Sequence, residues 1–65
     1  MKVIVNGTER ELADGTTVLS LLESLRLSPD KVAVELNRRL LRSMNYDRVL
    51  QAGDQVEVVT FVGGG

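Results

Sequence analysis

Hydrophobic and polar residues alternate in three stretches of the chain, at 1–6, 32–37 and 55–61. Alternation with a period of two is typical of a strand that buries one face, because successive side chains point to opposite sides of a sheet. We expect the inward positions to be Met1, Val3, Val5, Val32, Val34, Leu36, Val56 and Val58. The pattern therefore predicts three strands, each with a second face open to other contacts.

Turn residues separate these stretches and add two further strands. Asn6-Gly7 is a strong hairpin signal, because a type I′ turn needs positive φ at both central residues, and it predicts an antiparallel return over 8–12. The turn 37–39 leads into a short strand around Leu40 and Leu41. The turn 52–54 precedes the last strand, whereas 43–49 shows no clear period and is expected to be irregular or one helical turn.

One helix is predicted after the second strand. Val18, Leu21, Leu22 and Leu25 lie at i, i+3, i+4 and i+7 and form one apolar stripe. Thr16 or Thr17 is the expected N-cap, because a hydroxyl can accept a hydrogen bond from the free amides of the first turn. We expect the helix to end near Leu27, because Pro29 excludes the residue before it from the helical region.

The order of these elements is two strands, a helix, two strands and a final strand. A helix that buries an apolar stripe needs a sheet face to cover, so the pattern predicts an α+β fold with two layers. We expect a mixed sheet of four to five strands with the helix packed across one face. The first and last strands are expected to lie side by side at the centre of the sheet.

Composition argues against a self-contained enzyme. The chain has 65 residues and contains no Cys and no His, which removes thiolate and imidazole chemistry and the commonest metal ligands. Its nine carboxylates are spread over polar positions, which favours a solvated surface over a catalytic pair. The net charge of −1 gives no basic footprint for nucleic acid, and no apolar run approaches the ~18 residues of a membrane span. With no signal-peptide pattern at the start, we expect a cytoplasmic, non-enzymatic protein that binds no metal.

Four segments carry a resemblance to a known family. They are "MKVIVNG" at the start, "DGTTVLSLLESL" at the helix, "VAVELN" in the third strand, and "LQAGDQVEVVTFVGGG" at the end. Together they resemble the ThiS family of sulfur carriers, within the ubiquitin-like β-grasp superfamily. The resemblance implies a β-grasp domain over 1–61, followed by a flexible glycine tail over 62–65.

The resemblance also implies a function for the three terminal glycines. In the family, the terminal carboxylate, here on Gly65, is adenylated by a ThiF-type enzyme that uses ATP and magnesium, and sulfur then displaces the adenylate. The resulting thiocarboxylate supplies sulfur to the thiazole synthase ThiG, and a desulfurase relay is an expected sulfur donor. This chain itself is expected to hold no cofactor. Because glycine has no Cβ, Gly63 and Gly64 are expected to thread a narrow channel, and 62–65 can span roughly 13 Å at ~3.3 Å per residue.

The outward positions of the first and last strands are candidates for docking. If Val56 and Val58 face inward, Val59 and Phe61 share the opposite face with Ile4. An apolar group beside the tail suits a protein partner, so the predicted partner-binding residues are Ile4, Val59, Phe61 and Val62.

Three other functions remain open from the sequence. The first is a sulfur carrier for molybdopterin or for tRNA thiolation; molybdopterin carriers often have proline just before the glycines, whereas this chain has its one proline at Pro29. The second is a ubiquitin-like modifier that forms isopeptide bonds with lysines. The third is a non-catalytic β-grasp binding module.

Overall fold

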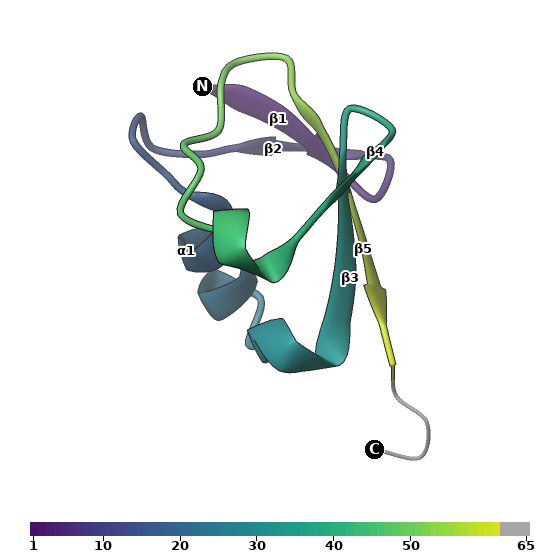
Figure 1. Cartoon of the computed structure of the whole chain (residues 1–65). Coiled ribbons are helices and arrows are strands. Elements are labelled where there is room, and N and C mark those ends of the chain that lie inside the picture. The colour runs from purple at the N-terminus through teal and green to yellow at the C-terminus, as the bar shows by residue number, and fades with distance from the viewer. Residues whose placement is uncertain (62–65) are drawn as a thin grey trace.

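The computed structural model describes residues 1–61, and within them five strands form one mixed sheet with one α-helix packed across a face (Figure 1). The strands are β1 (Lys2–Val5), β2 (Thr8–Glu11), β3 (Val32–Leu36), β4 (Arg39–Leu41) and β5 (Gln55–Thr60). The helix is α1 (Val18–Ser24), and two short 3-10 turns are η1 (Pro29–Lys31) and η2 (Ser43–Asn45). This is the α+β arrangement that the sequence predicts, with the sheet at five strands.

The last strand lies at the centre of the sheet, whose order is β2-β1-β5-β3-β4. Strand β1 runs parallel to β5 with Val5 level with Val56, and β3 runs antiparallel to β5 with Val34 opposite Val58. The hairpin partners β2 and β4 form the two outer edges. The expected pairing of the first and last strands is therefore confirmed.

Tight turns close both hairpins. Asn6 and Gly7 have φ of 50° and 81°, which confirms the predicted type I′ geometry between β1 and β2. Asn37 and Arg38 have φ of 53° and 71° and connect β3 to β4 in the same way. Arg38 occupies a left-handed position that usually favours glycine, which is why the sequence did not identify this turn type.

Helix α1 begins where the sequence predicts and ends earlier. Thr17 is its N-cap: the Ser20 amide donates to the Thr17 hydroxyl at 3.0 Å, and the Thr17 amide donates to the Ser20 hydroxyl at 2.8 Å. The last helical residue is Ser24 rather than Leu27, because Arg26 turns into the left-handed region with φ of 60°. The amide of Leu27 then donates to the carbonyl of Leu22 at 2.9 Å, which closes a Schellman turn before Pro29 is reached.

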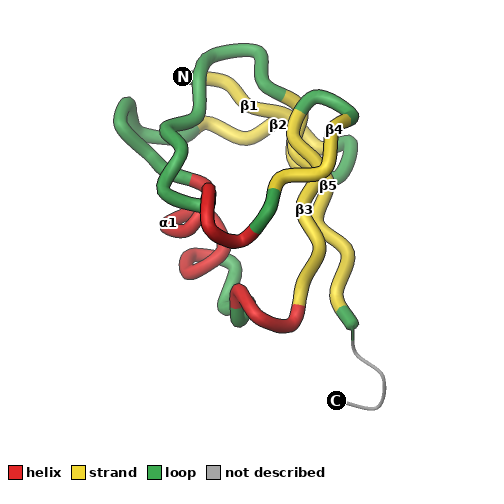
Figure 2. The backbone as a smooth tube through the Cα atoms, viewed as in Figure 1, coloured by secondary structure: helices red, strands yellow, loops and turns green. Residues whose placement is uncertain are grey.

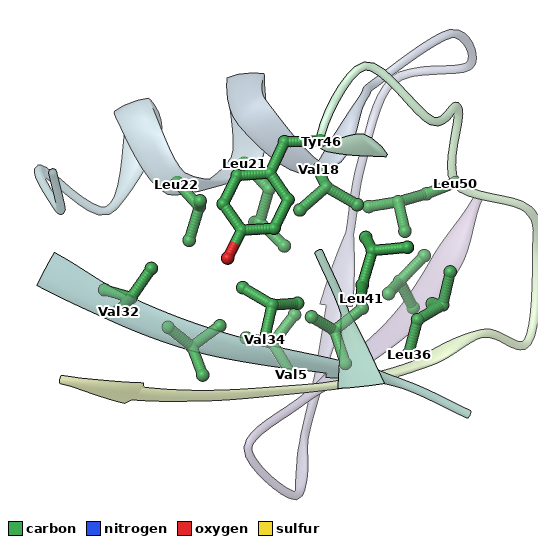
Figure 3. Packing of buried hydrophobic residues seen from close by; sticks show 13 residues of the cluster. Val5, Val18, Leu21, Leu22, Val32, Val34, Leu36, Leu41, Tyr46 and Leu50 are labelled. Carbon is green, nitrogen blue, oxygen red and sulfur yellow. The ribbon is translucent and has the colours of Figure 1, made fainter. Parts of the chain in front are cut away.

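The core lies between α1 and the sheet (Figure 3). Its strand positions are the predicted inward ones with two differences: Leu41 of β4, for which the sequence predicts no side, is also buried, and Met1 is half-buried and packs against the core. Tyr46 and Leu50, from the irregular segment before β5, complete the core with exposed fractions of 5% and 2%. This segment also accepts hydrogen bonds from the first amides of α1, since Val18 donates to Arg48 and Leu19 donates to Tyr46. The segment before β5, which shows no periodicity in the sequence, therefore covers the core and caps the first turn of α1.

Candidate functional site

Strand β5 carries the chain from the centre of the sheet to the segment that the sequence marks as functional. Its last described neighbour, Phe61, is held by its amide, which donates to the carbonyl of Lys31 at 2.8 Å. The predicted site residues Val62, Gly63, Gly64 and Gly65 lie outside the described residues. What the structure defines is therefore the surface from which that segment departs.

The outer face of the sheet, opposite α1, holds the three predicted docking residues that the structure describes. Val59 on β5 and Phe61, just after the strand, lie two positions apart and have exposed fractions of 61% and 59%. Ile4 is on the same face but half-buried, level with Gln55 and separated from Val59 by Glu57. The structure brings Val59 and Phe61 together and places Ile4 farther along the face.

Two residues that the sequence reasoning missed extend this outer face. Ala33 is the cross-strand partner of Val59, and Leu40, on the next strand, has an exposed fraction of 68%. Leu40 pairs with Glu35, so it lies diagonally from Ala33. The apolar group on the outer face is thus Val59, Phe61, Ala33 and Leu40. Register between strands, which one sequence does not display, would have been needed to find the last two.

Acidic side chains border this apolar group. Glu35 and Glu57 are directly opposite each other on β3 and β5, a like-charge arrangement that destabilises an isolated sheet. Within residues 1–61 neither carboxylate forms an ion pair, because the ion pairs there belong to the amino group of Met1. The outer face therefore presents apolar and negatively charged groups to a partner.

Titratable groups with shifted pKa values lie away from the outer face. A hydrogen bond from the Ser28 hydroxyl lowers the pKa of Asp30, and burial raises the pKa of Tyr46. In the described part of the chain, no three His, Cys, Asp or Glu side chains gather as metal ligands. Over the same residues, no helix is long and apolar enough to cross a membrane.

Known proteins resemble this chain over its whole length. Residues 3–65 match the ThiS family. The crystal structure of the thiamine biosynthesis protein ThiS from Geobacter metallireducens superposes with a TM-score of 0.83 at 35% identity, covering all of both chains. The solution structure of a thiamine biosynthesis protein from the same organism gives 0.82 at 35% identity, covering all of this chain and 88% of that one.

Two curated relatives are longer proteins. Thiazole synthases from Magnetococcus marinus and Paramagnetospirillum magneticum are 46% and 41% identical to this chain over 66 aligned positions. The chain spans about a fifth of their length.

The fold and the outer face together define a β-grasp domain of the ubiquitin-like type, with an exposed apolar group beside its last strand. More narrowly, the chain belongs to the ThiS family.

Proposed function

We propose that this chain is the sulfur carrier of thiamine thiazole synthesis, and that the carboxylate of Gly65 carries the sulfur. The observation that supports this most directly is the family match over residues 3–65, which includes the three glycines. The solved relatives are named thiamine biosynthesis proteins, which favours thiamine over molybdopterin or tRNA thiolation as the destination.

The proposed chemistry takes place in the active site of a partner. A carboxylate oxygen of Gly65 attacks the α-phosphorus of ATP and displaces pyrophosphate, which leaves an acyl adenylate and a good leaving group. Hydrosulfide then attacks the acyl carbon and displaces AMP, so that the terminal group becomes a thiocarboxylate. When a relay delivers the sulfur as a persulfide, the acyl disulfide that forms first is cleaved by a second thiol of the relay, which releases the thiocarboxylate and leaves a disulfide on the relay. The base, the magnesium ion and the nucleotide site belong to the ThiF-type enzyme in this scheme, and the chain supplies the terminal carboxylate and a surface for docking.

Three partners are proposed. A ThiF-type adenylating enzyme receives the chain terminus first, and a desulfurase relay supplies the sulfur. A thiazole synthase of the ThiG type then receives the thiocarboxylate. The last partner is supported by the two relatives named thiazole synthase, which contain a region like this chain within a longer protein.

Docking is proposed to use the outer face of the sheet. Val59 and Phe61 are the exposed apolar residues that immediately precede the segment 62–65 in the sequence, so a partner that covers them would receive that segment. Glu35 and Glu57 lack internal partners within 1–61, so basic side chains on the enzyme would offset their mutual repulsion.

Intact-mass measurement tests the proposed function. The chain is incubated with a ThiF-type enzyme, ATP, magnesium and sulfide, and we expect a gain equal to the mass difference between sulfur and oxygen. The gain should disappear without ATP and in a chain that lacks Gly65. That truncated chain should unfold at the same temperature as the full chain, which separates loss of chemistry from loss of fold. An unchanged mass with a competent enzyme would contradict the proposal, and covalent attachment to other proteins would identify a modifier instead.

A further inference from the structure

The end of β5 is paired on one side. Residues 32–36 of β3 pair with residues 56–60 of β5, but on the other side β1 ends at Val5, level with Val56. Figure 2 shows β3 and β5 continuing together beyond the β1–β2 hairpin. Strand β5 therefore has an open edge over Val58–Thr60.

The hydrogen bonds show which backbone groups face this edge. The Asp54 and Val56 carbonyls accept from Ile4 and Asn6 on the β1 side, and Phe61 donates to Lys31 on the β3 side. Since backbone groups alternate between the two sides of a strand, Thr60 faces the β1 side, where no strand remains. In the β3–β5 ladder Thr60 lies opposite Val32 in a pair without hydrogen bonds, because Phe61 and Gln55 belong to the pairs that bond on the β3 side, so among residues 1–61 the amide and carbonyl of Thr60 are not used by β3.

The side chain of Asn6 ends the β1–β5 pairing. Its Oδ1 accepts from the amide of Val58 at 2.8 Å, so the position at which a longer β1 would pair is taken by an amide group. Asn6 has turned into the hairpin with φ of 50°, which directs the chain into β2 and away from β5. The open edge is thus set by a specific turn and its side chain.

A pocket of about 330 Å³ adjoins the open edge on the helix side. Its walls include Thr60 from the end of β5, Leu27 from the turn after α1, and the basic residues Arg26 and Lys31. Phe61, which follows β5, borders both this pocket and the outer face. Within residues 1–61 neither cation forms an ion pair. A side chain that enters here meets apolar walls with positive charge at the rim.

We propose that Val58–Thr60 is a strand-addition site, where an extended segment of the ThiF-type enzyme pairs with β5 while the chain terminus enters that enzyme's active site. Backbone groups of the added strand satisfy the Thr60 amide and carbonyl. Alternate side chains of an added strand point to the helix side, so one of them enters the pocket. The chemistry of the pocket selects an apolar side chain there, with a carboxylate nearby to pair with Arg26 or Lys31.

Sequence composition at the other sheet edges supports this assignment. Strand β2 is charged at three of its four positions, with Glu9, Arg10 and Glu11 all exposed, and β4 is three residues long with an exposed arginine. Charge and shortness are common ways of discouraging strand addition at an edge. The residues Val58–Thr60 are uncharged and β-branched, which favours an added strand.

Amide hydrogen exchange at Thr60 tests this proposal. The choice of a ThiF-type enzyme as the partner rests on the proposed function. The isotope-labelled full chain is measured alone and in complex with a ThiF-type enzyme, and we expect the exchange rate of the Thr60 amide to fall at least about tenfold in the complex. Thr60→Pro removes the amide that faces the open edge and leaves the pairing with β3 intact. We expect this variant to bind about tenfold more weakly, while Thr60→Val, which keeps the amide, binds like the unmodified chain. A Lys31→Gln substitution should weaken binding several-fold.

The outcomes distinguish the strand proposal from the proposed function. Thiocarboxylate formation with unchanged Thr60 exchange, and equal binding of Thr60→Pro and Thr60→Val, would overturn the added strand alone. Protection of Thr60 in the free chain that rises with concentration would assign the edge to a second copy, and protection that is lost on removing 62–65 would assign it to the chain's own end. Failure of the unmodified chain to bind or react would overturn both proposals. The exchange measurement on the unmodified chain does not depend on the folding of any variant.

Discussion

The amino group of Met1 is held by two oxygen atoms, one from the last residue of β2 and one from the residue that follows the strand. It donates to the Glu11 carboxylate at 2.8 Å and to the Leu12 carbonyl at 2.7 Å, and Asp14 lies at 3.7 Å. The hydrogen bond to Glu11 is the main cause that raises the pKa of this amino group above 8.0, its ordinary value.

The raised pKa predicts a loss of stability in alkaline solution. Below pH 8.0 the amino group of Met1 is charged in both the folded and the unfolded chain, so its contribution to stability is fully present. This contribution is lost as the pH rises through the higher folded-state pKa. Thermal unfolding followed on both sides of pH 8.0 should show a steeper decline for the unmodified chain than for Glu11→Gln. Parallel curves would contradict the role given to Glu11.

Asn6 combines a backbone and a side-chain role. It occupies a left-handed turn position, which asparagine and glycine both tolerate, and its Oδ1 accepts from the partly buried amide of Val58. We expect Asn6→Gly to lower the free energy of unfolding by about 1–3 kcal/mol, because the turn survives but the Val58 amide loses its partner. Asn6→Asp keeps an acceptor and should cost less. Denaturant unfolding of the three proteins tests this, and equal stability of Asn6→Gly and the unmodified chain would refute it.

At the scale of elements, periodicity together with turn and capping residues was enough to predict the strands and the start of α1. Alternation placed Val3, Val5, Val56 and Val58 inward, because a strand has two faces and one of them is buried. The end of α1 was three residues off, since the left-handed turn at Arg26 is stabilised by tertiary packing and is not a glycine that a sequence reveals. Tyr46 was missed as a core residue because its segment has no repeat to read.

Alternation also predicted part of the candidate docking surface. Alternation along β5 places Val59 and Phe61 outward, and the structure agrees. Ala33 and Leu40 join them through the registers β3–β5 and β3–β4, which depend on the lengths of the turns and not on either strand alone. The open edge at Thr60 is a difference in length between two paired strands, so it exists only in the assembled sheet. The roles given to 62–65 stay a prediction.

Packing of α1 against the sheet should carry much of the stability. Leu22 is fully buried, whereas Leu19, on the same helix, has an exposed fraction of 36%. We expect Leu22→Ala to cost about 2–5 kcal/mol, which approaches the whole stability of a domain of this size. Leu19→Ala makes the same chemical change in the same helix and should cost much less. Chemical denaturation measures both, and similar losses would show that burial does not control the effect.

At the scale of the whole molecule, stability and contact surface lie on different sides of the sheet. The helix side holds the core, which α1 and the segment around Tyr46 close (Figure 3). The outer face carries exposed apolar residues and the carboxylates of Glu35 and Glu57, which form no ion pair within residues 1–61, and these groups contribute little to folding. Strand β5 contributes to both the core and the contact surface. Val56 and Val58 are buried in the core, while Val59 and, just after the strand, Phe61 are exposed. Substitutions on its two faces should therefore separate folding from partner binding.

Phe61 offers the sharpest test of this separation. Its side chain is exposed, its backbone bond to Lys31 does not depend on the ring, and aromatic residues often dominate the energy of an interface. We expect Phe61→Ala to weaken binding to a ThiF-type enzyme by about tenfold or more, with little change in the unfolding temperature. Met44→Ala is the matched control, because Met44 is 75% exposed on η2, away from β5. Calorimetric titration of both variants decides the matter: equal affinities would place the docking surface elsewhere, and a loss confined to Phe61→Ala would assign it to the end of β5.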